Sequence, residues 1–78
     1  MSNTIFLVVD GSVDDDEIHG DIGGIFTTLE LAREAVLNNL EGERFKEEKP
    51  NFWRVGTHYG MVQIVERELN PKEIFKND

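Results

Sequence analysis

The stretch IGGIFTTLELAREAVLNNLEG, residues 22–42, contains the strongest structural signals in the chain. Residues 22–26 form a short apolar run that predicts a strand, and its two glycines predict a bulge or a close backbone approach. Thr27 and Glu30 fit a capping box, in which a threonine at the N-cap is followed by a glutamate at the third helical position. The segment therefore predicts a strand that leads directly into a capped helix.

The helix predicted after Thr27 has one apolar stripe. Phe26 and Leu31 occupy the positions of a hydrophobic staple around the N-cap. Apolar residues then recur at helical spacing, which predicts a single buried face formed by Leu29, Ala32, Val36 and Leu40, with Ala35 beside them. Glu41 is expected to end the helix, with Gly42 just beyond it.

Toward the N-terminus, Ile5–Val9 is a run of strand-forming residues that Asp10-Gly11 is expected to stop. Residues 10–21 are interpreted as a polar connection. The two flanking strands are expected to pair as an antiparallel hairpin with a long acidic tip.

Toward the C-terminus, residues 41–50 are highly charged and are interpreted as a loop. Residues 52–55 and 61–69 predict two further strands, separated by a turn at residues 57–60. Asn70 and Pro71 match the start of a helix, so a short helical turn is expected over residues 71–76.

These elements predict an α+β fold in one domain spanning residues 1–78. We expect an antiparallel sheet of three to four strands with one main helix packed on one face, in the order β-β-α-β-β plus a short C-terminal helical turn. Because residues 5–9 carry apolar groups to both faces of the sheet, homodimerisation through the face without a helix, or through an edge strand, is a further expectation.

Charge is distributed unevenly along the chain, whose net charge is -8. Residues 1–32 contain seven acids and no Lys or Arg, whereas all eight bases lie in residues 33–78. A field of one sign repels nucleic-acid phosphates and attracts basic protein surfaces. We therefore expect no direct binding of nucleic acid by the protein, although acidity that only confers solubility is the simpler alternative.

The acidic segment DGSVDDDEIHGD, residues 10–21, also has to be considered as a metal site. An EF-hand loop starting at Asp10 would need glycine at position 6 and glutamate at position 12, but Asp15 and Asp21 stand there. The alternative is weak binding of a divalent ion by Asp14, Asp16, His19 and Asp21. The prediction is that the chain holds no metal and no cofactor.

Catalytic chemistry receives little support from the sequence. His19 and His58 are the only histidines, and no cysteine is present to act as a nucleophile. The adjacent carboxylates lie in a hydrophilic segment, where water screens their charges from one another. We predict a protein that is not an enzyme.

Bases and aromatic residues alternate over residues 44–54, as they do in proteins that bind single strands, but Glu43, Glu47 and Glu48 offset much of that charge. Phe52 and Trp53 would face opposite sides of a strand, so one is expected in the core and the other at an interface. Trp53 is the predicted interface anchor, because tryptophan is enriched at binding hot spots.

The segment IGGIFTTLELA, residues 22–32, resembles a pattern in small, mostly uncharacterised bacterial and phage proteins. These carry an aliphatic–glycine–aliphatic–aromatic strand end, a Ser/Thr pair and Glu-x-Ala opening a helix. The resemblance covers roughly residues 4–41 and 62–70; this chain departs from it by its double glycine and by a longer segment before the last strand. It implies a small α+β fold and a bacterial or phage setting, and it transfers no activity and no functional residue.

The sequence thus predicts a small acidic protein-binding module, with the alternative of a homodimeric structural or accessory protein. The expected target is a basic surface of another protein, which makes an inhibitor or partial DNA mimic the leading interpretation. No apolar run long enough for a membrane span and no signal peptide are recognised, so the cytoplasm of a bacterial cell or infected host is the expected location. The predicted partner-binding residues are Asp14, Asp15, Asp16, Glu17, Asp21 and Trp53.

Overall fold

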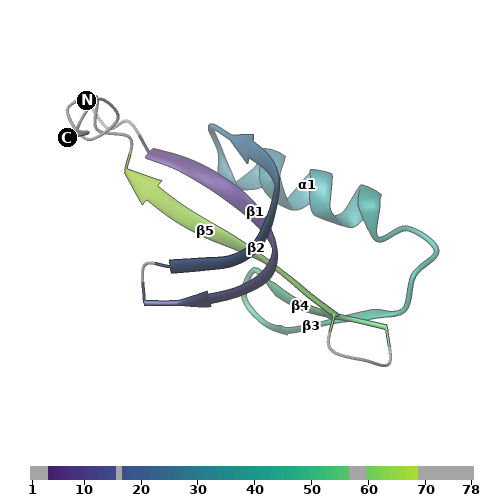
Figure 1. The fold of residues 1–78 in the computed structure, drawn as a ribbon. Helices are drawn as coiled ribbons and strands as arrows, with labels where there is room; N and C mark the ends of the chain where they lie inside the picture. Colours follow the sequence, from purple (N-terminus) through teal and green to yellow (C-terminus); the bar gives the residue numbers. More distant parts are fainter. Residues whose placement is uncertain (1–3, 16, 57–59, 69–78) are drawn as a thin grey trace.

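The computed structural model describes residues 4–15, 17–56 and 60–68 of the chain. Within them, five strands form one antiparallel sheet, and a single helix lies against it (Figure 1). The elements in chain order are β1 (Thr4–Asp14), β2 (Glu17–Phe26), α1 (Leu29–Asn39), β3 (Phe45–Lys49), β4 (Phe52–Val55) and β5 (Gly60–Glu68). The strand order in the sheet is β2-β1-β5-β4-β3, so the two hairpins β1–β2 and β3–β4 occupy its two edges.

The α+β class and the antiparallel sheet are confirmed, but the number and order of strands were predicted incorrectly. The sheet has five strands in the order β-β-α-β-β-β among the described residues. The additional strand, β3, lies inside residues 41–50, which the sequence had indicated as a loop. All five of its residues are exposed, so it lacks the apolar alternation that identifies a half-buried strand.

The core lies between α1 and the facing side of the sheet. Ala32, Val36 and Leu40 of the predicted helical stripe are buried against Val8 and Trp53. Phe6, Phe26, Val55, Val62 and Ile64 pack around this cluster and are partly buried. Because each fully buried apolar side chain contributes about 1.5–3 kcal/mol, this small cluster is the main source of cohesion between helix and sheet.

The opposite side of the sheet has no helix on it. Leu7 and Val9 alternate with Val8 and therefore point to this side, and both are nevertheless buried. Gln63 is paired with Val9, and its side-chain amide donates a 2.9 Å hydrogen bond to the Gly11 carbonyl, so its stem crosses this face. Farther out on β2, Ile22 and Ile25 remain 50% and 62% exposed.

The start of the helix differs by one residue from the predicted capping box. Thr28 is the N-cap, and its Oγ1 accepts a 3.1 Å hydrogen bond from the Leu31 amide. Glu30 is therefore at the second helical position and cannot complete the reciprocal box. The predicted Phe26–Leu31 staple is also wrong in position, since Leu31 is 48% exposed. Two consecutive threonines offer the same capping chemistry, so the sequence alone does not distinguish Thr27 from Thr28 as the N-cap.

Strand β1 passes through Gly11 instead of ending there, which corrects the predicted polar connection over residues 10–21. Gly11 lies directly opposite Gly20. A Cβ on Gly11 would lie 2.3 Å from the His19 carbonyl oxygen, and one on Gly20 would lie 2.3 Å from the Asp10 carbonyl oxygen. Both residues have positive φ, +148° and +158°. This glycine pair lets the two backbones approach closely. The β1–β2 hairpin as a whole is curved (Figure 1).

The predicted β-bulge in the second strand is confirmed. Val8 pairs with Gly24 and Val9 pairs with Ile22, which leaves Gly23 as the extra residue. Strands β4 and β5 also agree with the predicted strands to within a residue. Gly60 belongs to β5 and not to the predicted turn, whose other residues, 57–59, lie outside the described ranges. The predicted helical turn over residues 71–76 also lies outside them.

Candidate functional site

The predicted acidic loop is the outer half of the β1–β2 hairpin. We call residues 10–15 and 17–21 the acidic arm. Successive residues of a strand point to opposite faces, and directly paired residues share a face. One face of the arm therefore carries every polar side chain of its paired residues, namely those of Asp10, Ser12, Asp14, Glu17, His19 and Asp21.

The other face of the acidic arm is apolar. It is formed by Val13 and Ile18, which are paired and partly buried, and by the glycine pair at Gly11 and Gly20. The six polar residues of the first face are all exposed. The arm is thus amphipathic, and the pairing register of the hairpin determines which side its carboxylates face.

Three cross-strand pairs arrange the charges of the arm. Asp10 is opposite Asp21, and Asp14 is opposite Glu17, with Ser12 and His19 between them. Like charges directly opposite one another destabilise a sheet. Among the described residues, the only ion-pair contact of these carboxylates is between Glu17 Oε1 and His19 Nε2, at 3.7 Å. Within the described ranges, the two carboxylates of each facing pair are therefore held close together without a Lys or Arg to neutralise them.

The register also separates the candidate metal ligands. Asp14 and Asp21 lie at opposite ends of the arm, four residues apart along the ladder, which corresponds to about 13 Å. No group of three or more His, Asp or Glu side chains within the described ranges is placed to hold a metal ion. Asp16, a member of both the candidate ion site and the predicted partner-binding set, lies outside those ranges, as does His58.

Trp53 does not occupy the predicted interface position. Its side chain has 0% exposure and packs under α1 with Val36 and Ala32. Phe52 points to the opposite side of the sheet, where Lys49 Nζ lies 5.1 Å and the Arg54 guanidinium carbon 5.6 Å from its ring centroid. One of these two neighbours was expected in the core and the other outside it. The buried residue is Trp53 and not Phe52, because the helix covers the side of the sheet on which the tryptophan ring lies.

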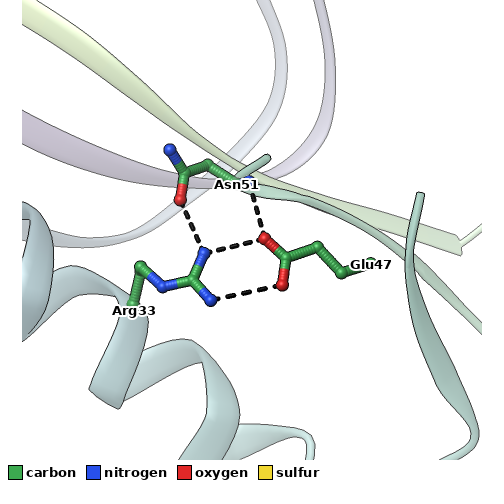
Figure 2. A network of polar contacts seen from close by, with 3 residues as sticks. All are labelled: Arg33, Glu47 and Asn51. Atoms are coloured by element: carbon green, nitrogen blue, oxygen red, sulfur yellow. Dashed lines mark hydrogen bonds and ion pairs between the residues drawn. The ribbon is translucent and has the colours of Figure 1, made fainter. Parts of the chain in front are cut away.

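A polar network that the sequence did not indicate connects the helix to the β3–β4 hairpin (Figure 2). Arg33 of α1 makes a bidentate contact with Glu47 of β3, through Nη1 to Oε2 at 2.8 Å and Nη2 to Oε1 at 3.2 Å. Arg33 Nη1 also donates to Asn51 Oδ1 at 2.8 Å, and the Asn51 amide donates to Glu47 Oε2 at 2.9 Å. The guanidinium lies 5.2 Å from the Trp53 ring centroid.

The electrostatics of this network indicate a structural role. The side-chain hydrogen bonds between Arg33 and Glu47 lower the pKa of Glu47 and raise the pKa of Arg33. A bond from the Asn51 amide lowers the pKa of Glu47 further. Asn51 has φ +64°, a conformation that asparagine tolerates better than most residues. That asparagine, following Pro50, was the one local signal for a turn between two strands.

Most Lys and Arg residues in the described part of the chain lie at the edge of the sheet opposite the acidic arm. The β3–β4 hairpin and the residue before it carry Arg44, Lys46, Lys49 and Arg54. Arg54 Nη2 pairs with Glu48 Oε1 at 3.3 Å, and Arg33 pairs with Glu47 as described above. Of the acids of this hairpin, Glu48 is thus paired with Arg54 of the hairpin itself and Glu47 with Arg33 of α1, which distinguishes the hairpin from the acidic arm.

Comparison of the chain with known protein families, curated proteins and solved structures finds no match. No helix in the described part of the chain is long and apolar enough to cross a membrane. The candidate site is therefore defined by the geometry and charge of the acidic arm alone.

Proposed function

We propose that this protein is a non-enzymatic protein-binding module that docks its acidic arm on a basic surface of another protein. The observation that carries the proposal is the alignment of Asp10, Asp14, Glu17 and Asp21 on one exposed face of a two-stranded arm. Asp15, in the turn between the strands, adds a further exposed carboxylate.

The absence of bases from residues 1–32 supports this function on electrostatic grounds. A patch of one sign accelerates association with a surface of the opposite sign and suppresses unsuitable partners. Two paired strands also hold the carboxylates in a fixed register, so less conformational freedom is lost on binding than with a flexible loop.

The internal repulsion of the arm supports the same function. The pairs Asp10–Asp21 and Asp14–Glu17 oppose hairpin formation, since each brings two negative charges together. A basic partner relieves this repulsion, whereas in the free protein it reduces stability. A charge whose only purpose was solubility would not need to be concentrated on one face of one arm.

The class of partner follows from the charge. Surfaces basic enough to attract the arm are typical of proteins that bind nucleic acid, where Lys and Arg neutralise phosphates. Binding there would exclude the nucleic acid, so inhibition of a host or self-encoded nucleic-acid-binding protein is the function we propose. The bacterial or phage setting of this proposal comes from the sequence resemblance alone.

Affinity capture from the native host tests the proposal when three baits are compared. The first bait is the unaltered protein, and the second carries Asp14→Asn, Asp15→Asn, Glu17→Gln and Asp21→Asn. The third loses the same charge elsewhere, through Glu34→Gln, Glu41→Gln, Glu66→Gln and Glu68→Gln. A basic protein retained by the first and third baits but not by the second supports the proposal. Equal retention by the first two baits contradicts it.

Homodimerisation is the second candidate function, and the exposed isoleucines of β2 favour it. Ile22 and Ile25 pair with Val9 and Leu7 and so lie on the side of the sheet without a helix. Their exposure of 50% and 62% leaves apolar area that a second copy would bury. Sedimentation over a range of concentrations, with Ile25→Thr as the matched variant, tests this alternative; a strict monomer at high concentration excludes it.

A further inference from the structure

A cavity of about 400 Å³ lies between the C-terminal half of α1 and the sheet. Its apolar lining includes Val8 of β1, Val36 and Leu40 of the helix end, and Val55 and Val62 of β4 and β5. This volume falls within the range of about 300–1,000 Å³ that is usual for sites of small ligands. The cavity lies on the side of the sheet that α1 covers, so it is separate from the exposed isoleucines of β2.

The bulge in β2 helps to keep this cavity open. Gly23, the extra residue of the bulge, is one of the lining residues. A Cβ added there would lie 3.6 Å from Val8 Cγ1, in ordinary contact with the apolar lining. A larger side chain at residue 23 would therefore extend from the strand alongside Val8, where at present there is space.

The polar residues that line the cavity in the described part of the chain are either acidic or neutral. Asp10, Asn39 and Glu43 are lining residues and are exposed, whereas Val8, Val36 and Leu40 are buried. The described lining residues include no Lys, Arg or His. The last turn of α1 contains no basic residue either, so the negative end of the helix dipole is not offset at this place.

The geometry points to a binding site for a small organic cation with an apolar body, such as an alkyl or aryl amine. The apolar part would replace water against Val36, Leu40 and Val62, while the ammonium group would stay at the rim beside Asp10 and Glu43. Two carboxylates and the helix C-terminus favour a cation over a neutral ligand of equal size, and they disfavour an anion. The inference goes beyond the proposed docking of the acidic arm and does not depend on it.

Three probes that each contain six carbons and differ in their head groups test this site. Hexylammonium, 1-hexanol and hexanoate are titrated separately into the full chain, and backbone amide shifts are followed by NMR. We expect saturable shifts centred on Val8, Val36 and Val55, with hexylammonium bound about three- to tenfold more tightly than 1-hexanol and hexanoate weakest. Absence of saturable shifts at these residues, or equal binding of all three probes, overturns the inference.

Two variants separate the contributions of charge and space. Asp10→Asn with Glu43→Gln should remove the preference for hexylammonium over 1-hexanol while leaving the weaker binding of the apolar tail. Gly23→Leu should abolish binding of all three probes by filling the cavity. Asp14→Asn with Glu17→Gln removes the same charge from the acidic arm and should leave probe binding unchanged. If this last variant also lost the preference for hexylammonium over 1-hexanol, the preference would reflect only the net charge of the protein. The proposed role of Asp10 and Glu43 would then be wrong.

Because the rim variants do not fill the cavity, they keep the test decisive if Gly23→Leu fails to fold. The capture experiment on the acidic arm leaves Asp10 and Gly23 unaltered in all its baits. Failure of the amine site would therefore leave the proposed docking function standing, and failure of docking would leave the amine site standing.

Discussion

The two hairpins at the edges of the sheet use charge in different ways. On the β3–β4 hairpin, Glu47 binds Arg33 and Glu48 binds Arg54, so its acids have fixed basic neighbours. On the acidic arm, carboxylates face one another across the ladder, with a histidine as their only ion-pair neighbour among the described residues. The comparison indicates that charge on β3–β4 supports the fold, whereas the described carboxylates of the arm have no Lys or Arg partner, which is the premise of the proposed docking.

The anchoring of β4 by Trp53 gives the largest expected effect. Trp53→Ala removes a fully buried ring and should lower the free energy of unfolding by about 3–5 kcal/mol. Phe52→Ala, its neighbour on the other side of the sheet, should cost clearly less. Urea unfolding followed by circular dichroism measures both variants. If Trp53→Ala were as stable as Phe52→Ala, the helix-facing core would be assigned incorrectly.

The glycine pair of the arm should give the next largest effect. Gly11→Ala places a Cβ against the His19 carbonyl and forces alanine into a positive φ, which should cost at least about 1–2 kcal/mol. Gly23→Ala is the matched control, because its added Cβ meets only ordinary contacts and it should change stability by less than about 0.5 kcal/mol. Thermal unfolding with amide hydrogen exchange of residues 12–20 measures both effects. If the amides of residues 12–20 exchanged at equal rates in the two variants, the close approach of the backbones at Gly11 and Gly20 would be assigned incorrectly.

Removing the charge of Glu47 should destabilise the protein by about 0.5–1 kcal/mol at neutral pH. The network lowers the folded-state pKa of Glu47, so its stabilisation is complete above the ordinary carboxyl range and is lost as pH falls through the lowered pKa. The stability difference between the unaltered protein and Glu47→Gln should therefore shrink below about pH 4. Glu48→Gln, at the more exposed pair with Arg54, should have the smaller effect. If the stability difference between the unaltered protein and Glu47→Gln did not change with pH, the ionised Glu47 carboxylate would not be the group that stabilises the network.

On the acidic arm, the same kind of change should have the opposite sign. Asp21→Asn relieves repulsion with Asp10 and should raise the free energy of unfolding by about 0.2–1 kcal/mol. Glu66→Gln, which pairs with Phe6, removes an equal charge without relieving that contact. Urea unfolding at low ionic strength compares the two variants. Destabilisation by Asp21→Asn would show that the arm needs its charge to fold.

Local patterns in the sequence predicted much of the fold. Residues 29–40 carry the helical period, residues 5–9 and 61–69 are rich in strand-forming residues, and the double glycine indicated the bulge. These signals are local because they arise from the spacing of side chains within one element. The acidic segment also alternates polar residues with Gly11, Val13, Ile18 and Gly20. Its apolar side chains, those of Val13 and Ile18, were too few to indicate strands.

The features that were missed depend on pairing between distant residues. Gly11 resembles a strand end until its register places it opposite Gly20. The contact of Arg33 with Glu47 joins residues 14 positions apart, through a strand whose exposed residues carry no apolar pattern. The burial of Trp53 rather than Phe52 depends on which side of β4 the helix covers. None of these can be read from spacing within a single element.

The central claim is that the acidic arm serves association rather than folding. The most direct measurement is the association rate with the captured basic partner as ionic strength is raised, for the same three proteins used as baits. The account predicts that neutralising Asp14, Asp15, Glu17 and Asp21 slows association and flattens its salt dependence, while the equal-charge control on other surfaces stays close to the unaltered protein. Identical rates and salt slopes for the arm variant and the unaltered protein would contradict it.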